Sequence, residues 1–310
     1  MSFSGSVKEE LYKHISSARH CQIAELAAIL AFCGSIGCRE DVNFLQIEAE
    51  NALVVRKCFT LLEKTFNIGS NISVRKEGKN GGYGFHIAQE AVMERILTET
   101  GFWQKDQFFA GLREPVSQKL IEEVCCRRAF LRGVYLAAGS MSDPEKSNHL
   151  EMVCSQEMQA VQIQKLLQEF EIEAHIVLRK RYFVVYIKEG SAISDFLNVT
   201  EAHLALMEFE NCRIVRDMRN SINRRVNCET ANITKTVSAA ARQTEDILFL
   251  RDKYGFENLP ENLREMAEVR LEYPDVPLRE LGAYLDPPVG KSGVNHRLRK
   301  LCELADRIRS

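Results

Sequence analysis

An internal duplication constrains the fold of this chain more than any other feature of its sequence. Three pairs of segments match one another: Ala24–Ile36 with Ala129–Met141, Asn43–Ile47 with Asn148–Met152, and Val74–Lys76 with Leu178–Lys180. The offset is 105 residues in the first two pairs and 104 in the third. A nearly fixed offset across several segments indicates a duplicated structural unit. The sequence before the C-terminal part therefore predicts two copies of one fold.

Both copies predict the same opening elements. Each begins with an apolar helix rich in small residues, over 23–33 and over 129–138, and a Gly-Ser pair ends each helix. A short strand follows, and then a strand of alternating polarity over 44–49 in one copy and over 150–154 in the other. Alternation with a period of two is typical of a strand that is buried on one face.

The remaining elements of each copy are a longer amphipathic helix, two strands and a final helix. The amphipathic helix carries these apolar positions in the two copies: Leu53, Leu61, Leu62 and Phe66, then Met158, Leu166, Leu167 and Phe170. The two strands are expected over these ranges: 71–76 with 83–87, and 175–180 with 182–187. Each copy thus reads α-β-β-α-β-β-α, which is an α+β fold class.

Small residues line the first helix of each copy. They occupy these positions: Ala27, Ala28, Ala31 and Gly34, then Gly133, Ala137 and Gly139. Because small side chains let helix backbones approach closely, we expect the two helices to pack on each other across a pseudo-two-fold axis. Each sheet would then form one half of a saddle on one side of the helix pair.

The length and composition are those of a globular protein. The 310 residues are enough for two domains, and a content of 45% hydrophobic and 27% charged residues excludes a disordered chain or a uniformly basic coat protein.

The charge of the chain is distributed unevenly. The formal charge of −2 divides into a net +3 over 211–310 and a net −5 elsewhere. We expect a duplicated domain over 1–215, with repeats at about 1–110 and 111–215, and a helical domain over 216–310. Local basic segments suit a protein that touches a polyanion with one part only.

Several classes of site and location are disfavoured. No apolar run approaches the ~18 residues of a membrane span, and residues 1–11 lack the pattern of a signal peptide. The ten cysteines include no CxxC pair and no Cys/His pair at zinc-ligand spacing, and Cys125-Cys126 has no further ligand nearby in sequence. We therefore expect reduced cytosolic thiols, no metal and no cofactor. The glycine-rich segment with Gly78, Gly81, Gly82 and Gly84 falls between two strands, which predicts a hairpin loop rather than a phosphate loop.

The C-terminal part predicts a helix-turn-helix. Pro260 opens a helix and Pro274 ends it, and its apolar stripe is Leu263, Met266, Ala267 and Leu271. A short helix over 278–285 follows, and the segment Asp286–Gly290 breaks it. We place the whole helix-turn-helix motif over about 278–304. Ser292 is expected to cap its second helix.

The last helix predicts a DNA-recognition face. Its apolar positions lie on one face: Val294, Leu298, Leu301 and Ala305. The polar and basic residues lie on the opposite face: Lys291, Ser292, Asn295, His296, Arg299 and Lys300. Arg297 flanks this face. Asn and Arg side chains match base edges and phosphates in the major groove, so these residues are candidate DNA contacts. Arg224 and Arg225 form a second polar patch, either for DNA or between domains.

The first helix of each copy resembles the signature helix of the LAGLIDADG homing endonucleases. Leu131–Gly139 carries the clearer match, and Leu26–Gly34 is similar to a first copy. The resemblance implies that an acidic residue just before the closing Gly binds the catalytic metals. The acidic positions of the motif hold no carboxylate here: Cys33 and Ala31 in one copy, Ala138 and Leu136 in the other. Asp143 lies beyond the helix in a predicted turn. Because Mg²⁺ prefers carboxylate ligands, we expect no catalytic residues and no nuclease activity.

Nearly the whole chain resembles the WhiA family of sporulation regulators from Gram-positive bacteria. The most specific stretches are Gly139–Glu151, Arg225–Asn232 and Val289–Leu301. The resemblance implies a sequence-specific DNA-binding transcriptional regulator linked to sporulation or cell division, and not an enzyme. It also implies a bacterial, cytoplasmic, nucleoid-associated protein with double-stranded DNA as partner, and with the transcription machinery or another regulator as a further partner.

Two alternatives stay open at this stage. One is an active LAGLIDADG-type endonuclease whose carboxylates have moved, and the other is an adaptor that binds proteins through the duplicated domain. Two strands end in basic residues, Arg75-Lys76 and Arg179-Lys180-Arg181, at positions where the nuclease family binds DNA. Because the duplicated domain has a net negative charge, we expect only weak DNA binding there. His149 is expected to have a structural role.

Overall fold

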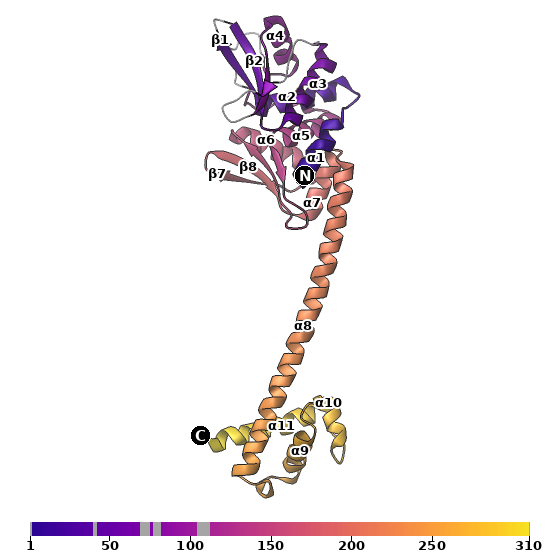
Figure 1. Cartoon of the computed structure of the whole chain (residues 1–310), viewed down its shortest axis with the longest axis vertical. Coiled ribbons are helices and arrows are strands. Elements are labelled where there is room, and N and C mark those ends of the chain that lie inside the picture. Colours follow the sequence, from indigo (N-terminus) through magenta and orange to yellow (C-terminus); the bar gives the residue numbers. More distant parts are fainter. Residues whose placement is uncertain (1, 40–41, 69–74, 77–81, 104–111, 310) are drawn as a thin grey trace. The chain divides into compact units, whose positions relative to one another are not determined.

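The computed structural model describes residues 2–39, 42–68, 75–76, 82–103 and 112–309. These residues form two compact units, Met1–Arg216 and Asp217–Ser310, and each unit has its own hydrophobic core. Figure 1 shows the helices and strands in chain order. A helix α8 (His203–Lys253) begins in the first unit and ends in the second.

The first unit contains the predicted duplication. The first repeat consists of α2 (Arg19–Cys33), β1 (Gly34–Arg39), β2 (Val42–Ala49), α3 (Ala52–Phe66), β3 (Arg75–Lys76), β4 (Tyr83–Ile87) and α4 (Glu90–Glu99). The second consists of α5 (Val124–Ala138), β5 (Gly139–Met141), β6 (Leu150–Cys154), α6 (Glu157–Glu169), β7 (His175–Arg179), β8 (Tyr182–Ile187) and α7 (Gly190–Val199). The predicted α-β-β-α-β-β-α order and the α+β class are confirmed. A helix α1 (Phe3–Lys13) precedes the first repeat, and a short 3₁₀ helix η1 (Gln118–Ile121) precedes the second.

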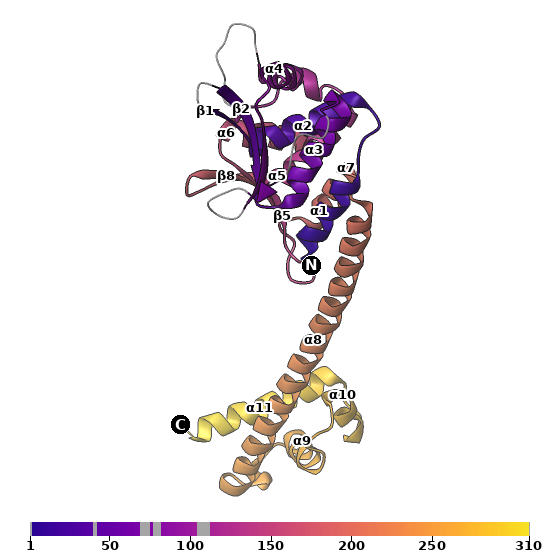
Figure 2. The ribbon, with the colours of Figure 1, turned by 45° about the horizontal axis from the view of Figure 1, so that its top comes forward.

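The two sheets have the same topology and register. Their strand orders are β1-β2-β4-β3 and β5-β6-β8-β7, and all neighbouring strands are antiparallel. Gly34 pairs with Ile47 in one sheet, and Gly139 pairs with Met152 in the other, so the pairing keeps the offset found in the sequence. Both sheets lie on the same side of the pair formed by α2 and α5 (Figures 1 and 2).

Helices α2 and α5 pack directly on each other, as the small residues predict. A Cβ atom at Gly133 would lie 2.6 Å from the carbonyl oxygen of Glu25 and 2.8 Å from the Cβ atom of Ala28. Ala28 is the residue that the duplication pairs with Gly133, so the closest approach lies at equivalent positions of the two repeats. All residues of α2 from Cys21 to Ala31 are buried, which accounts for its mostly apolar sequence.

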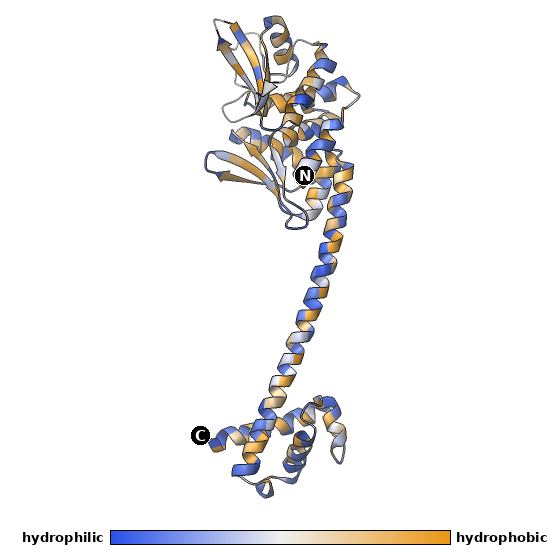
Figure 3. Cartoon of the chain, viewed as in Figure 1, coloured by the Kyte–Doolittle hydropathy of each residue, from blue (hydrophilic) through white to orange (hydrophobic). Residues whose placement is uncertain are grey.

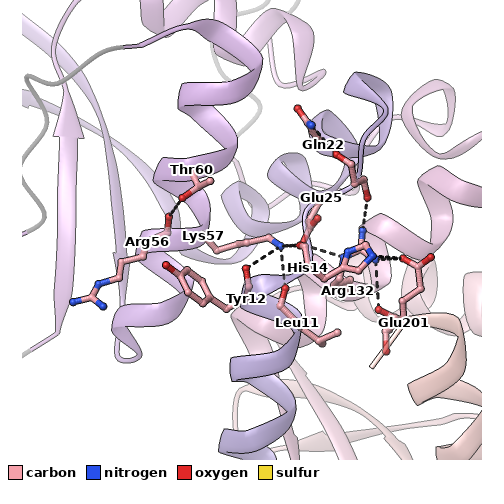
Figure 4. A network of polar contacts seen from close by, with 12 residues as sticks. Leu11, Tyr12, His14, Gln22, Glu25, Arg56, Lys57, Thr60, Arg132 and Glu201 are labelled. Carbon is pink, nitrogen blue, oxygen red and sulfur yellow. Dashed lines mark hydrogen bonds and ion pairs between the residues drawn. The ribbon is translucent and has the colours of Figure 1, made fainter. Parts of the chain in front are cut away.

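A charged network crosses this helix pair inside the first unit (Figure 4). The Oε1 atom of Glu25 on α2 lies 3.1 Å from the Nζ atom of Lys57 on α3 and 3.2 Å from the Nε atom of Arg132 on α5. All three side chains are buried. Arg132 also contacts the Glu201 carboxylate at 2.5 Å, and Lys57 donates to the Leu11 carbonyl at 2.9 Å. Burial lowers the pKa of Lys57, and the neighbouring Glu25 opposes that shift.

Three local expectations need correction or fall outside the described residues. Met158 is exposed, because it lies in the first turn of α6 and the core instead takes Ala160, Ile163 and two glutamines. The strand expected over 175–180 ends at Arg179, because Lys180 adopts a left-handed backbone conformation in the turn before β8. Of the strand expected over 71–76 and the glycine loop after it, Arg75–Lys76 is described and 77–81 is not, and Gly84 lies in β4, paired with Glu48, rather than in the loop.

The second unit is helical and contains the predicted C-terminal helices. They are α9 (Glu261–Glu272), α10 (Leu278–Leu281), a 3₁₀ turn η3 (Gly282–Tyr284) and α11 (Lys291–Arg309), and a short 3₁₀ turn η2 (Phe256–Asn258) precedes α9. Pro260 stands just before α9 and Pro274 just after it, as expected. The end of α8 contributes Ile247 and Leu250 to the same core.

Helix α8 is long, mostly polar and exposed along its middle. Residues 217–239 are all exposed, and the colours of Figure 3 show hydrophilic and hydrophobic residues interspersed along the helix. In its first turns, Arg216 donates to the Pro144 carbonyl at 3.0 Å and to Asn148 Oδ1 at 2.7 Å, and this holds the start of α8 to the second repeat. Among the described residues, no helix combines the length and apolarity needed to cross a membrane.

The helix crossing gives a stability prediction with a definite sign. On helix propensity alone, Gly133→Ala would stabilise α5 by about 0.5–1 kcal/mol. Because the new Cβ meets backbone at 2.6 Å, we expect instead a loss of about 1–3 kcal/mol in the free energy of unfolding. Urea denaturation of the full chain followed by far-ultraviolet circular dichroism measures the change, and a stabilised variant would contradict the close crossing.

Candidate nucleic-acid interface

The predicted recognition helix α11 is fixed in its core by one face. Val294, Leu298, Leu301 and Ala305 are completely buried, in one cluster with residues of α9 and α10. The spacing predicted this face correctly. Because four buried anchors hold the helix, its opposite face has a defined orientation relative to the other helices of the unit.

Six of the seven candidate residues on α11 are exposed. They are Lys291, Ser292, Asn295, His296, Arg299 and Lys300. Arg299 lies 2.8 Å from Glu303 one turn along the helix, a weak exposed pair that leaves its guanidinium accessible. This face therefore offers amide, hydroxyl, imidazole and cationic donors from the first three turns of one helix. Exposure is the condition for DNA contact, and the contact itself stays a prediction.

Two details of α11 differ from the sequence expectations. The helix begins at Lys291, and the Val294 amide donates to the Gly290 carbonyl at 3.1 Å, so Gly290 and not Ser292 stands at the cap position. Ser292 lies inside the first turn with its side chain exposed. Arg297 is only partly exposed, and its Nη1 atom lies 3.4 Å from Glu265 on α9. Arg297 therefore joins two helices of the unit and is less free to contact DNA than its neighbours.

The turn before α11 is held by specific contacts. The Val289 amide donates to the Gly282 carbonyl at 2.9 Å, and a Cβ atom at Gly282 would lie 1.9 Å from the Val289 carbonyl oxygen. Glu265 accepts the Asp286 amide at 2.6 Å at the other end of the turn. Only a residue without a side chain fits at Gly282, so this position sets how closely the two helices of the motif approach.

The other predicted basic patch lies on α8. Arg224 and Arg225 are exposed in its middle, and Arg225 lies 3.5 Å from Glu229 one turn further on. Of the basic residues nearer the start of α8, Arg213 pairs with Glu210 at 3.1 Å, and Arg216 is bound to the second repeat. Arg224 and Arg225, like Arg219, are thus exposed cations of this segment.

The helix ends where the nuclease family binds metals carry no carboxylate in this chain. Cys33 and Ala138 end α2 and α5, and burial raises the pKa of Cys33 to about 12, so its thiol is neutral near pH 7. The ammonium group of Lys8 from α1 lies close enough to interact with Cys33. Asp143 lies in the expected turn, where its carboxylate accepts the Glu145 amide at 3.0 Å. A neutral thiol and a lysine make a poor site for Mg²⁺.

The positive charge on the exposed face of the second sheet is partly neutralised by an acidic residue. Glu151 on β6 lies 3.1 Å from Arg179 on β7 and 3.3 Å from His149, which also stacks on Tyr186. His149 thus has contacts that fit the expected structural role. The side chains of Arg75 and Lys76 lie outside the described residues. Arg179 thus has an acidic partner on this face, and Lys180 and Arg181 in the turn beside it are exposed.

The fold and these sites define a duplicated LAGLIDADG-like domain joined to a helix-turn-helix unit. Three family models match successive parts of the chain: the WhiA N-terminal LAGLIDADG-like domain at 19–103, the WhiA LAGLIDADG-like domain at 127–219 and the WhiA C-terminal HTH domain at 222–305. The chain belongs to the WhiA family.

Relatives match over the full length of the chain. A probable cell division protein WhiA from Lachnoclostridium phytofermentans is 51% identical over 312 residues and covers 100% of both chains. A protein of the same name from Desulforamulus reducens is 45% identical, over 100% of this chain and 97% of its own. The crystal structure of full-length DUF199/WhiA from Thermatoga maritima is 28% identical, with a TM-score of 0.58 and 99% of each chain covered.

The turn geometry predicts that Gly282→Ala disrupts the motif. The new Cβ would overlap the Val289 carbonyl, so the segment before α11 must move away from Gly282. We expect faster amide hydrogen exchange over 278–290 in the full chain, and unchanged exchange in α2 and α5. Equal protection of 278–290 in the variant and the parent would show that this contact does not hold the turn.

Proposed function

We propose that this chain is a sequence-specific DNA-binding transcriptional regulator and that α11 is its recognition helix. The observation that carries the proposal is the division of α11 into a fully buried apolar face and an exposed face of Asn, Ser, His and basic residues. A helix fixed in this way can enter the major groove without rearrangement, and its first turns then meet base edges.

The exposed residues of α11 fall into two groups by chemistry. Ser292, Asn295 and His296 lie in the first two turns and suit base edges, where an Asn amide can pair with both N6 and N7 of adenine. Lys291, Arg299 and Lys300 supply positive charge for phosphates, and Arg299 can also reach guanine. Arg224 and Arg225 on α8 serve as additional phosphate contacts. Double-stranded DNA is thus the proposed partner.

The duplicated domain serves in this proposal as a scaffold without nuclease activity. The neutral Cys33 thiol, Ala138 and the nearby Lys8 support the loss of metal-dependent cleavage, because phosphodiester hydrolysis of this type needs carboxylates that hold Mg²⁺. The net negative charge of this part favours a protein partner over DNA, and the transcription machinery or another regulator fits that role.

The biological setting follows from the family. The relatives named above are called probable cell division proteins, and this supports a role in the control of cell division or sporulation in a bacterium. A regulator of this kind acts in the cytoplasm on the nucleoid.

The central prediction concerns two basic residues on the exposed face. The double variant Arg299→Ala/Lys300→Ala should bind its promoter sites more than about tenfold more weakly, since each good contact contributes ~1–3 kcal/mol. Promoter fragments from chromatin immunoprecipitation of the parent protein supply the DNA, and gel shifts at one fixed salt concentration give the affinity.

A matched control separates specific contacts from lost charge. Lys253→Ala/Arg264→Ala removes the same charge from exposed positions on two other helices of the same unit, α8 and α9. We expect promoter affinity close to that of the parent for this control. Unchanged affinity in the Arg299/Lys300 variant would refute the recognition role of α11.

The nuclease prediction is tested on the same promoter fragments. Incubation of the purified chain with Mg²⁺ or Mn²⁺ should leave duplex DNA uncut, because both helix ends lack a carboxylate. Metal-dependent cleavage that co-elutes with the chain through successive columns would show an intrinsic nuclease and would restore the endonuclease alternative. Cleavage that separates from the chain on a column points to a contaminant.

A further inference from the structure

Four metal-ligating side chains meet where α2 and α5 begin. They are His20 and Cys21 in the first turn of α2, and Cys125 and Cys126 in the first turn of α5. One ligand atom from each residue lies within 4.8 Å of all the others. The Nδ1 atom of His20 is 3.0 Å from the Cys126 sulfur and 3.5 Å from the Cys21 sulfur. This cluster stands at the opposite ends of the helices from Cys33 and Ala138.

The four residues are related by the duplication itself. The offset of 105 residues that aligns α2 with α5 also aligns His20 with Cys125 and Cys21 with Cys126. Each helix therefore supplies two adjacent ligands from equivalent positions. The pseudo-two-fold relation of α2 and α5 brings these pairs together, although each pair alone has no metal-binding spacing in the sequence.

The dimensions of the cluster fit a tetrahedral metal ion. Zinc bonds to thiolate sulfur at about 2.3 Å and to imidazole nitrogen at about 2.0 Å, so its ligands lie about 3.5–3.8 Å from one another. A small contraction of the cluster reaches these distances. Three sulfurs and one imidazole form a donor set that selects zinc over Mg²⁺ or Ca²⁺, which take oxygen ligands.

The surroundings of the cluster also suit bound zinc. Cys21, Cys125 and Cys126 lie in the first turns of α2 and α5, where the helix dipoles favour the negative charge of a metal-bound thiolate. Burial acts in the opposite direction and raises the pKa of the free Cys21 and Cys126 thiols, so a bound metal must displace their protons. Arg128 lines a cavity of about 620 Å³ beside His20, Cys21 and Cys125, and its Nε atom is buried without a hydrogen-bond partner. This cation can balance the net negative charge of a zinc ion with three thiolates, and the cavity provides a path for the ion.

We propose that His20, Cys21, Cys125 and Cys126 form a structural zinc site that ties the two repeats together at the start of their central helices. With four protein ligands the coordination shell is closed, so the metal stabilises the fold and does no chemistry. The site is independent of DNA binding, and it replaces the expectation from sequence that the chain binds no metal.

The test starts with the intact chain, expressed with added zinc and purified under reducing conditions. Mass spectrometry of the metal content should give one zinc per chain. After exchange with Co²⁺, the absorption spectrum should show thiolate-to-cobalt charge transfer and the intense ligand-field bands of a tetrahedral site. A strong chelator should lower the melting temperature of the chain, and zinc should restore it.

Variants then assign the ligands. Cys125→Ser should weaken zinc binding by at least about 100-fold, because the loss of a direct ligand costs more than the loss of an outer-shell partner. Since Cys125 is exposed, α2 and α5 should still pack in this variant. Cys38→Ser and Cys228→Ser, which change exposed cysteines elsewhere, should bind zinc as the parent does. Circular dichroism monitors folding of every variant.

Three results would overturn the proposal, and two of them do not depend on any variant. The first is a reduced parent chain that holds no stoichiometric zinc and gives no tetrahedral cobalt spectrum. The second is a folded Cys125→Ser variant with the zinc affinity of the parent. The third is a disulfide among Cys21, Cys125 and Cys126 in the freshly purified chain, detected by mass after alkylation.

Discussion

The close crossing of α2 and α5 is the contact on which the rest of the first unit depends. The backbone of Gly133 approaches the Glu25 carbonyl and the Ala28 side chain so closely that no room is left for a Cβ atom. Each helix leads directly into the first strand of its own sheet, so the crossing fixes both sheets on one side of the helix pair. Because the two repeats share this one axis, their cores join into a single cluster.

The buried charges around Glu25 add specificity to that crossing. Glu25, Lys57 and Arg132 come from three different helices, and removing Glu25 would leave the buried Lys57 without its carboxylate partner. Breaking such a group typically costs about 3–5 kcal/mol, whereas forming it stabilises little, so its main effect is to disfavour other packings of the helices. The proposed zinc site would fix the same helix pair nearer its start.

In our proposal, the second unit carries DNA recognition and the first unit serves as the scaffold. Its core holds α11 by four buried side chains and leaves the opposite face exposed, while the helix ends of the duplicated domain offer a thiol and a lysine in place of carboxylates. Function in the family thus rests, in our proposal, on the small basic unit. Charge follows the same division, with net +3 over 211–310 and net −5 elsewhere.

The sequence by itself determined the duplication, the order of elements in each repeat and the buried stripe of α11, because these depend on local periodicity and on a fixed offset. It did not predict the length of α8, because the exposed middle of this helix has no apolar stripe packed against a core. It also did not predict that Gly290, and not Ser292, stands at the cap position of α11. Only the tertiary structure brought Glu25 to Lys57 and Arg132, and His20 and Cys21 to Cys125 and Cys126. These contacts join residues far apart in the chain, and such proximity exists only once the helices have packed.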